Sequence, residues 1–164
     1  MVLNNAQSLI YHVRDLIEVQ EILREIREAT SINNKKAILS QYRDNENLKE
    51  VLKYTYNPNI NYGDNVDENI INIKETNTLD DIHSLWYMLA KLSLNNNDDL
   101  VKQEFKDYMA FFPDIEELIT GIIKKDLNLG ISISSINKII KNLDECFVND
   151  QSSKHKVINI FKYK

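Results

Sequence analysis

The segment from Ile122 to Leu143, IIKKDLNLGISISSINKIIKNL, predicts two helices joined by a tight corner. Its first part has the apolar spacing of a helix, Gly130 interrupts that spacing, and serines precede a second apolar stripe. A glycine just past a helix adopts the left-handed conformation at little cost, and a serine oxygen can cap the next helix. We therefore expect one helix to end at Gly130 and the next to be capped by Ser132 or Ser134.

Helical spacing also dominates the rest of the chain. Apolar residues recur every three or four positions, with breaks of cap and turn residues between the stripes. The other expected helices cover residues 16–30, 35–42, 45–55, 79–89 and 101–112, and the helix that leads to the corner covers residues 113–127. Asp44 can cap the third of these, and Thr78 with Asp81 resembles a capping box that opens the fourth. Apolar residues cover so much of the helix at 113–127 that we expect it to be central.

These helices predict an all-α fold, a single compact domain of six or seven helices. Residues 57–77 form the one long loop, which is rich in asparagine and aspartate. We expect residues 1–17 to be an N-terminal extension, residues 18–143 to be the helical domain and residues 144–164 to be a basic tail. The tail ends in KVINIFKYK, whose β-branched residues suit a short strand, or else a disordered arm.

Length and composition narrow the class of protein. A chain of 164 residues can bury one core, and it holds no apolar run of membrane-spanning length and no signal-peptide pattern. Cys146 is the only cysteine, so an internal disulfide is excluded. Its acidic neighbours do not favour a thiolate, which indicates a small hydrophobe rather than a nucleophile. We expect a cytoplasmic protein with no membrane partner, in the host cytoplasm if the chain is viral.

Positive charge gathers in the last third of an acidic chain. The formal net charge is −5, but residues 118–164 carry eight lysines and four acids. Residues 64–117 carry four basic and thirteen acidic residues, and residues 1–63 carry eight of each. An asymmetry of this kind indicates a polyanionic partner for the basic part, while the acidic middle is typical of a solvated face.

The sequence contains no residue set with catalytic or metal-binding spacing. The three histidines, His12, His83 and His155, are far apart and have no neighbouring cysteine. The three glycines are also far apart, which excludes a glycine-rich phosphate loop. Adjacent acids such as Glu116 and Glu117 stand at an expected helix start, where they compensate the helix dipole. We therefore do not expect an independent enzyme.

The corner at Gly130 combines the features of a phosphate site. The start of the helix after it offers free backbone N–H groups, serine hydroxyls and the positive end of a helix dipole. Four lysines flank the corner in the sequence: Lys124, Lys125, Lys138 and Lys141. Such a site would hold a sugar–phosphate backbone without reading bases. The same glycine and serines are also sufficient for a purely structural corner.

Two stretches resemble a known family. From Lys125 to Ile139, KDLNLGISISSINKI has a basic residue, Asp-Leu, two residues, a glycine, a small residue and a serine before a helix that ends in Asn-Lys. From Leu23 to Gly63, a helix is followed by a serine turn, a lysine-flanked AIL segment and the stretch DNENLKEVLKYTY. Both resemble the N-terminal DNA-binding domain of ATP-dependent DNA ligases, especially the short phage type, in the order found there.

The resemblance implies an all-α domain that binds nicked double-stranded DNA across the minor groove, mainly through phosphates. The positions that match the motif become expected DNA contacts, together with their polar neighbours: Lys125, Gly130, Ser132, Asn137 and Lys138, with Ser134, Lys124 and Lys141. Weaker candidates lie in the turn from Thr30 to Lys36, which includes Lys35, and in the loop at Tyr62–Gly63. In this family an adenylation domain and an OB-fold domain accompany the DNA-binding domain.

The chain also departs from the ligase pattern. The family's nucleophile is a lysine in a Lys-x-Asp-Gly motif, and no Asp-Gly pair exists here. We therefore expect no cofactor in this chain; ATP and Mg²⁺ would belong to an adenylation domain outside it, and a separate ligase adenylation subunit becomes an expected partner. The alternative is a helical protein-interaction module that derives from a ligase domain and recruits or regulates a partner without binding DNA.

Overall fold

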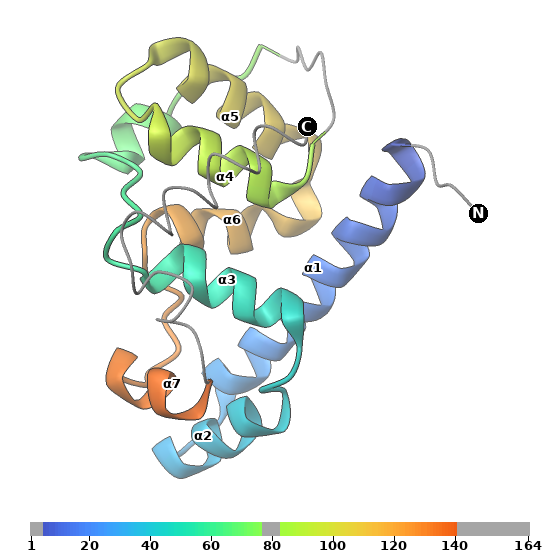
Figure 1. The fold of residues 1–164 in the computed structure, drawn as a ribbon, viewed down its shortest axis with the longest axis vertical. Helices are drawn as coiled ribbons and strands as arrows, with labels where there is room; N and C mark the ends of the chain where they lie inside the picture. The colour runs from blue at the N-terminus through green and yellow to red at the C-terminus, as the bar shows by residue number, and fades with distance from the viewer. Residues whose placement is uncertain (1–4, 77–82, 141–164) are drawn as a thin grey trace.

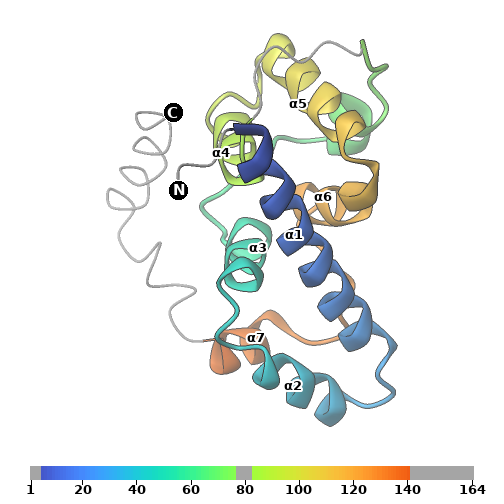
Figure 2. The ribbon, with the colours of Figure 1, turned by 90° about the vertical axis from the view of Figure 1, so that its right-hand side faces the viewer.

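The longest helix among the described residues, α1, connects both ends of a helical assembly (Figures 1 and 2). The computed structural model describes residues 5–76 and 83–140. These residues form seven α-helices and two short helical turns: α1 (Asn5–Glu28), α2 (Ile32–Gln41), α3 (Glu46–Tyr56), the π-helical turn η1 (Asp67–Ile71), α4 (Leu85–Leu94), α5 (Asp99–Phe111), the 3-10 turn η2 (Pro113–Ile115), α6 (Glu116–Ile123) and α7 (Ile133–Ile139).

The helices are arranged in pairs along the longest axis of the molecule. Helices α4 and α5 pack together at one end, and α2 and α7 pack together at the other (Figure 1). Helices α3 and α6 pack against each other between these two pairs. Helix α1 contacts α2, α3 and η2, so it links the α2–α7 pair to the remainder of the fold (Figure 2).

The core is built from the apolar stripes that the sequence predicts. In α1 the buried stripe begins at Leu16 and ends at Ile26, and both side chains are fully buried. Helix α6 buries Leu118, Ile119 and Ile122 together with Ile123, which confirms that it is central. Full burial of one such side chain stabilises the fold by about 1.5–3 kcal/mol. The prediction of a compact all-α domain with six or seven helices is confirmed.

Caps explain where most helices begin. Side-chain oxygens accept hydrogen bonds from the first-turn N–H groups of α2, α3, α4, α5 and α7, at Ser31, Asn45, Ser84, Asp98 and Ser132. The predicted cap of α3 is wrong by one position, because the side-chain oxygen Oδ1 of Asn45, not Asp44, accepts from the N–H of Leu48 at 2.9 Å. The capping box predicted at Thr78 and the tail at 144–164 lie outside the described residues.

Helix α1 is longer than its apolar pattern indicates. It begins at Asn5 rather than at residue 16, and it crosses residue 17, where the sequence suggests the boundary of an extension. The early turns expose Ile10 and Tyr11, so they lack the stripe that marks a helix in the sequence. The loop at 57–77 likewise contains the turn η1, whose short length has no periodic signal.

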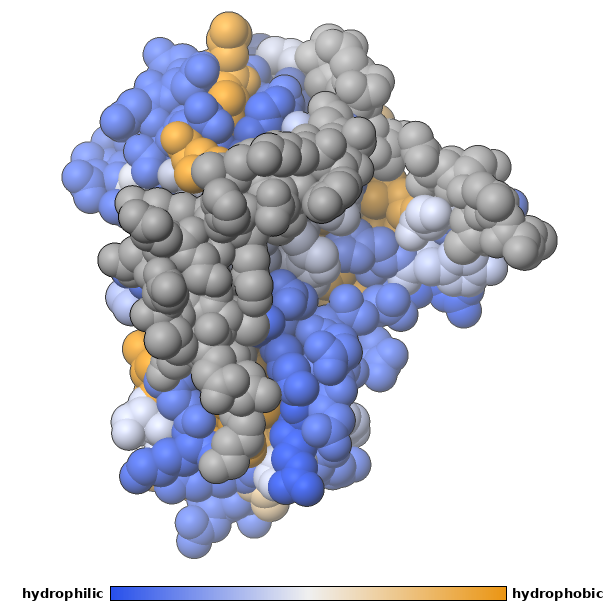
Figure 3. Space-filling view, viewed as in Figure 1, coloured by the Kyte–Doolittle hydropathy of each residue, from blue (hydrophilic) through white to orange (hydrophobic). Residues whose placement is uncertain are grey.

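The face shown in Figure 3 is mostly hydrophilic over its described residues, and hydrophobic residues occupy separate small patches. In the ranges 5–76 and 83–140, every helix is too short or too polar to cross a membrane. Isolated surface hydrophobes are normal in folded proteins. To locate a binding surface, the position of these hydrophobic residues relative to charged residues is therefore more informative than their number.

His12 joins α1 to the start of α4. Its Nε2 accepts a hydrogen bond of 3.0 Å from the backbone N–H of Leu85, the first residue of α4. Its ring packs edge-on against Trp86, with 5.7 Å between ring centroids. Burial lowers the pKa of His12 below its ordinary value of 6.5, although Asp15 acts in the opposite direction. Protonation would remove the acceptor and place positive charge at the positive end of α4.

We predict that the free energy of unfolding decreases as the pH falls below about 6.5, because the unfolded chain then binds a proton that folded His12 resists. The decrease should stop once the pH is below the lowered pKa of the folded state. The variant His12→Gln cannot titrate and should lose this part of the pH dependence. Urea denaturation from about pH 7.5 to 5 measures it, and an identical decrease in both proteins would show that His12 is not its source.

Candidate functional site

Helix α6 ends in a tight turn well before Gly130. Its last residue is Ile123, and Lys125 adopts the left-handed conformation with φ 61°. The backbone N–H groups of Lys125 and Asp126 bond back to carbonyl oxygens in the last turn of α6, at 2.9 and 3.0 Å. This is the Schellman arrangement, which usually has glycine at the left-handed position. The prediction that Gly130 terminates this helix is therefore wrong, and Lys125 takes that place.

The side chain of Lys125 explains why a lysine occupies a position that favours glycine. Its Nζ donates hydrogen bonds to the backbone carbonyls of Asn57 and Ile60, in the loop after α3. Burial lowers the pKa of Lys125 below its ordinary value. Nearby, the Tyr56 hydroxyl accepts a hydrogen bond of 3.1 Å from the N–H of Leu127. These bonds fasten the α6–α7 connection to the end of α3.

Gly130 lies against α2. It has φ +74°, and a Cβ at this position would lie 3.3 Å from both Cε and Nζ of Lys35. The Lys35 ammonium group donates hydrogen bonds to the carbonyls of Ile26 and Arg27, at 3.0 and 2.9 Å. Lys35 thus provides donors for two carbonyls in the last turn of α1, and its positive charge compensates the negative end of that helix dipole. A side chain at this position would be strained by the positive φ and would press against this lysine, which favours glycine.

The two serine-capped helix starts of the corner region belong to helices that pack together. Of the two serines predicted as alternatives, Ser132 is the cap of α7, and its Oγ accepts from the N–H of Ser135 at 3.1 Å. Ser134 is exposed in the first turn. Ser31 caps α2 in the same way, accepting from the N–H of Asn34 at 3.1 Å. Segments from opposite ends of the chain therefore form one surface.

We call this surface, formed by residues 29–43 and 127–140, the α2–α7 end. It contains four basic residues and no acidic residue, in a chain whose net charge is −5: Lys35, Lys36, Arg43 and Lys138. Lys138 is exposed in the last turn of α7, Lys36 is half-buried on α2, and Asn137 is half-buried beside Lys138. The seven ion pairs between described residues involve neither α2 nor α7.

The remaining candidate residues are placed elsewhere. Lys124 points to η1, where its Nζ lies 3.4 Å from a carboxylate oxygen of Asp67. Tyr62 is buried and donates a hydrogen bond of 2.7 Å to the carbonyl of Tyr54, so it supports the loop. Lys141 lies outside the described residues. Across residues 5–76 and 83–140, no three His, Cys, Asp or Glu side chains gather in a metal-binding group.

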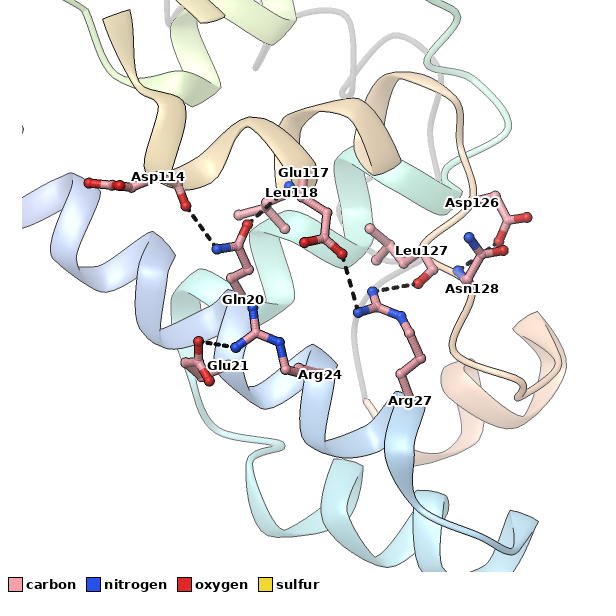
Figure 4. A network of polar contacts seen from close by, with 10 residues as sticks. All are labelled: Gln20, Glu21, Arg24, Arg27, Asp114, Glu117, Leu118, Asp126, Leu127 and Asn128. Atoms are coloured by element: carbon pink, nitrogen blue, oxygen red, sulfur yellow. Dashed lines mark hydrogen bonds and ion pairs between the residues drawn. The ribbon is translucent and has the colours of Figure 1, made fainter.

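A groove of about 580 Å³ lies between α1 and α6, and its polar side chains bind mainly backbone groups around it (Figure 4). Gln20 accepts from the N–H of Leu118 at 3.2 Å and donates to a carbonyl in η2 at 2.8 Å, so it caps the start of α6. Arg27 donates to the carbonyl of Leu127 at 2.9 Å and lies 3.7 Å from Glu117. No pattern in the sequence marks these contacts, because they join distant parts of the chain.

We predict that Lys125→Met lowers the free energy of unfolding by about 1–3 kcal/mol, because it leaves two backbone carbonyls without their donor. The neighbouring substitution Lys124→Met is the matched control. It removes only an exposed ion pair, so its effect should lie within about 0.5 kcal/mol. Urea denaturation of both variants measures the difference. Equal stability of the two variants would contradict the anchoring role of Lys125.

Comparison with known proteins does not assign the chain to a family. No family model matches it, and no curated protein matches it in sequence. The chemistry of the α2–α7 end is therefore the basis on which a function can be proposed.

Proposed function

We propose that the α2–α7 end binds the sugar–phosphate backbone of nicked double-stranded DNA without sequence preference. In this proposal the chain is the DNA-binding part of an ATP-dependent DNA ligase, and the adenylation domain lies outside it. One observation carries the proposal: residues 29–43 and 127–140, far apart in an acidic chain, pack together and hold four basic residues and no acid, with Glu28, Asp44 and Asp126 directly outside these ranges.

The available ammonium groups at this end are those of Lys36 and Lys138. Neither forms an ion pair with a described residue, whereas lysines on α3, α4 and α5 are paired with nearby carboxylates. A phosphate can therefore approach these two groups without displacing an internal partner. Lys35 is different, because two carbonyl oxygens already hold its ammonium group. Its charge still adds to the local positive potential.

Polar groups of α2 complete a backbone-binding surface. The start of this ten-residue helix is exposed at Ser31, Asn33 and Asn34, and its dipole is positive there. Exposed Ser134 adds a hydroxyl group across the α2–α7 contact, whereas the Ser132 hydroxyl already donates a hydrogen bond of 3.0 Å to Ser135 Oγ. Amide, hydroxyl and ammonium donors of this kind make most of the protein contacts to DNA phosphates and carry no base information.

Preference for a nick and association with an adenylation domain rest on the ligase resemblance. The two resembling stretches, Leu23–Gly63 and Lys125–Ile139, contain α2 and α7, which pack against each other. Their proximity supports the proposal, because residues that share one ligand must share one surface. Lys125 then acts in positioning this surface through its carbonyl contacts, rather than in touching DNA.

We predict that the chain binds labelled nicked duplex in a fluorescence anisotropy titration, and that the logarithm of its affinity falls linearly with the logarithm of salt concentration. The double variant Lys36→Gln/Lys138→Gln should bind more weakly to every sequence tested. Its salt slope should be smaller by roughly 0.9 for each phosphate contact that is lost.

The matched control is Lys74→Gln, which removes an exposed lysine near α5, at the other end of the molecule. It should leave both the affinity and the salt slope unchanged. Absence of binding by the folded wild-type chain at low salt would contradict the proposal and favour a protein-interaction module. Equal effects of the control and the double variant would show that binding is not located at the α2–α7 end.

A further inference from the structure

The last turn of α1 is fastened both to α2 and to the connection that leads to α7. From α2, the Lys35 ammonium group donates hydrogen bonds to the carbonyls of Ile26 and Arg27, at 3.0 and 2.9 Å. From α1, Nη2 of Arg27 donates to the carbonyl of Leu127 at 2.9 Å (Figure 4). Arg27 therefore accepts a bond from α2 through its backbone and donates one to the α6–α7 connection through its side chain.

Gly130 completes this arrangement on the side of α7. It lies three residues after Leu127, and a Cβ added to it would lie 3.3 Å from both Cε and Nζ of Lys35. Ser132, which caps α7, follows two residues later. We call the contacts among Arg27, Lys35, Leu127 and Gly130 the α1 junction. Three segments that are far apart in the sequence hold one another there.

The two lysines proposed to meet phosphates lie on the helices that leave this junction. Lys36 follows Lys35 on α2, and Lys138 is in the last turn of α7. These helices have ten and seven residues, too few to be stable alone, so tertiary contacts must fix them. A duplex presents its phosphates at a regular spacing along each strand. Both ammonium groups can meet phosphates at little ordering cost only if α2 and α7 keep one arrangement.

We propose that Lys35 is a positioning residue for DNA binding, which holds Lys36 and Lys138 in one arrangement without contacting DNA itself. This inference rests on the proposed function. Two of the three N–H groups of the Lys35 ammonium already bind carbonyls, and the side chain is half-buried. A phosphate would have to compete with these carbonyls. The ligase resemblance implies a different role, because it places Lys35 and Gly130 among the expected DNA contacts.

A double-mutant cycle distinguishes positioning from direct contact. Residues that act independently change the affinity by factors that multiply, whereas residues of one network do not. If Lys35 fixes the place of Lys138, the loss of Lys138 should matter less once Lys35 is absent. Two direct phosphate contacts would instead give factors that multiply, and each loss would reduce the salt slope by roughly 0.9.

The test combines Lys35→Met with Lys138→Gln and measures binding to labelled nicked duplex by fluorescence anisotropy. We expect the effect of Lys138→Gln to be roughly threefold smaller, or less still, in the Lys35→Met background than in wild type. The matched control replaces Lys35→Met by Lys74→Gln, which removes a positive charge at the other end of the molecule. Its factor and that of Lys138→Gln should multiply within about twofold.

Arg27→Gln provides a second, independent arm of the test. It breaks the α1 junction from the side of α1 by removing the donor to the Leu127 carbonyl, and it leaves Lys35 in place. It should show the same kind of coupling to Lys138→Gln. Circular dichroism checks that each variant is folded, and this arm decides the question if Lys35→Met does not fold.

Two outcomes would overturn the inference and leave the proposed function standing. If folded Lys35→Met binds duplex as tightly as wild type, the α1 junction has a structural role only. If the factors of Lys35→Met and Lys138→Gln multiply, Lys35 acts on its own, as a phosphate contact or as a local charge. Failure of the proposed function is distinct from both, because wild type itself would then not bind duplex at low salt, and the inference would fail with it.

Discussion

The hydrogen bonds from the Lys125 ammonium group to the carbonyls of Asn57 and Ile60 position the surface on which the proposed function depends. Helix α7 has seven residues, too few to be stable alone, so its place must come from tertiary contacts. The connection that leads to it is held at the end of α3, by the Lys125 bonds and by the hydrogen bond from the Leu127 N–H to the Tyr56 hydroxyl. Gly130 then meets Lys35, and two distant segments become neighbours.

Several helix ends in this fold are completed by side chains from other helices. The Lys35 ammonium group donates hydrogen bonds to two carbonyls in the last turn of α1. The side chains of Gln20 and His12 accept hydrogen bonds from backbone N–H groups in the first turns of α6 and α4. Backbone groups at helix ends have no partner within their own helix, and burying them without one is costly. These bonds specify how the helices meet, in addition to the nonspecific burial of apolar stripes. At the α2–α7 end, Lys36 and Lys138 form no ion pair with a described residue and have no such structural task.

Much of the fold follows from periodicity, and little of the long-range bonding does. The stripe at Leu118–Ile123 and the serines before α7 are local signals, and the structure confirms the central helix and the Ser132 cap. No local pattern in the sequence predicts the left-handed backbone conformation at Lys125. The hydrogen bonds that stabilise it join the Lys125 side chain to a loop far away in the sequence. For the same reason the lysines around Gly130 looked equivalent in the sequence, although Lys124 pairs with Asp67 and Lys125 binds carbonyls.

Backbone amide chemical shifts, followed by NMR during titration with a nicked duplex at low salt, test most directly whether the α2–α7 end is the contact surface. We expect the largest shifts to map to Ser31–Lys36 and to Gly130–Lys138, two segments that the fold brings together. The amides of α4 and α5, which pack at the other end, should stay unchanged, as binding at the α2–α7 end requires. Shifts centred on α4 and α5, or on the groove between α1 and α6, would contradict it.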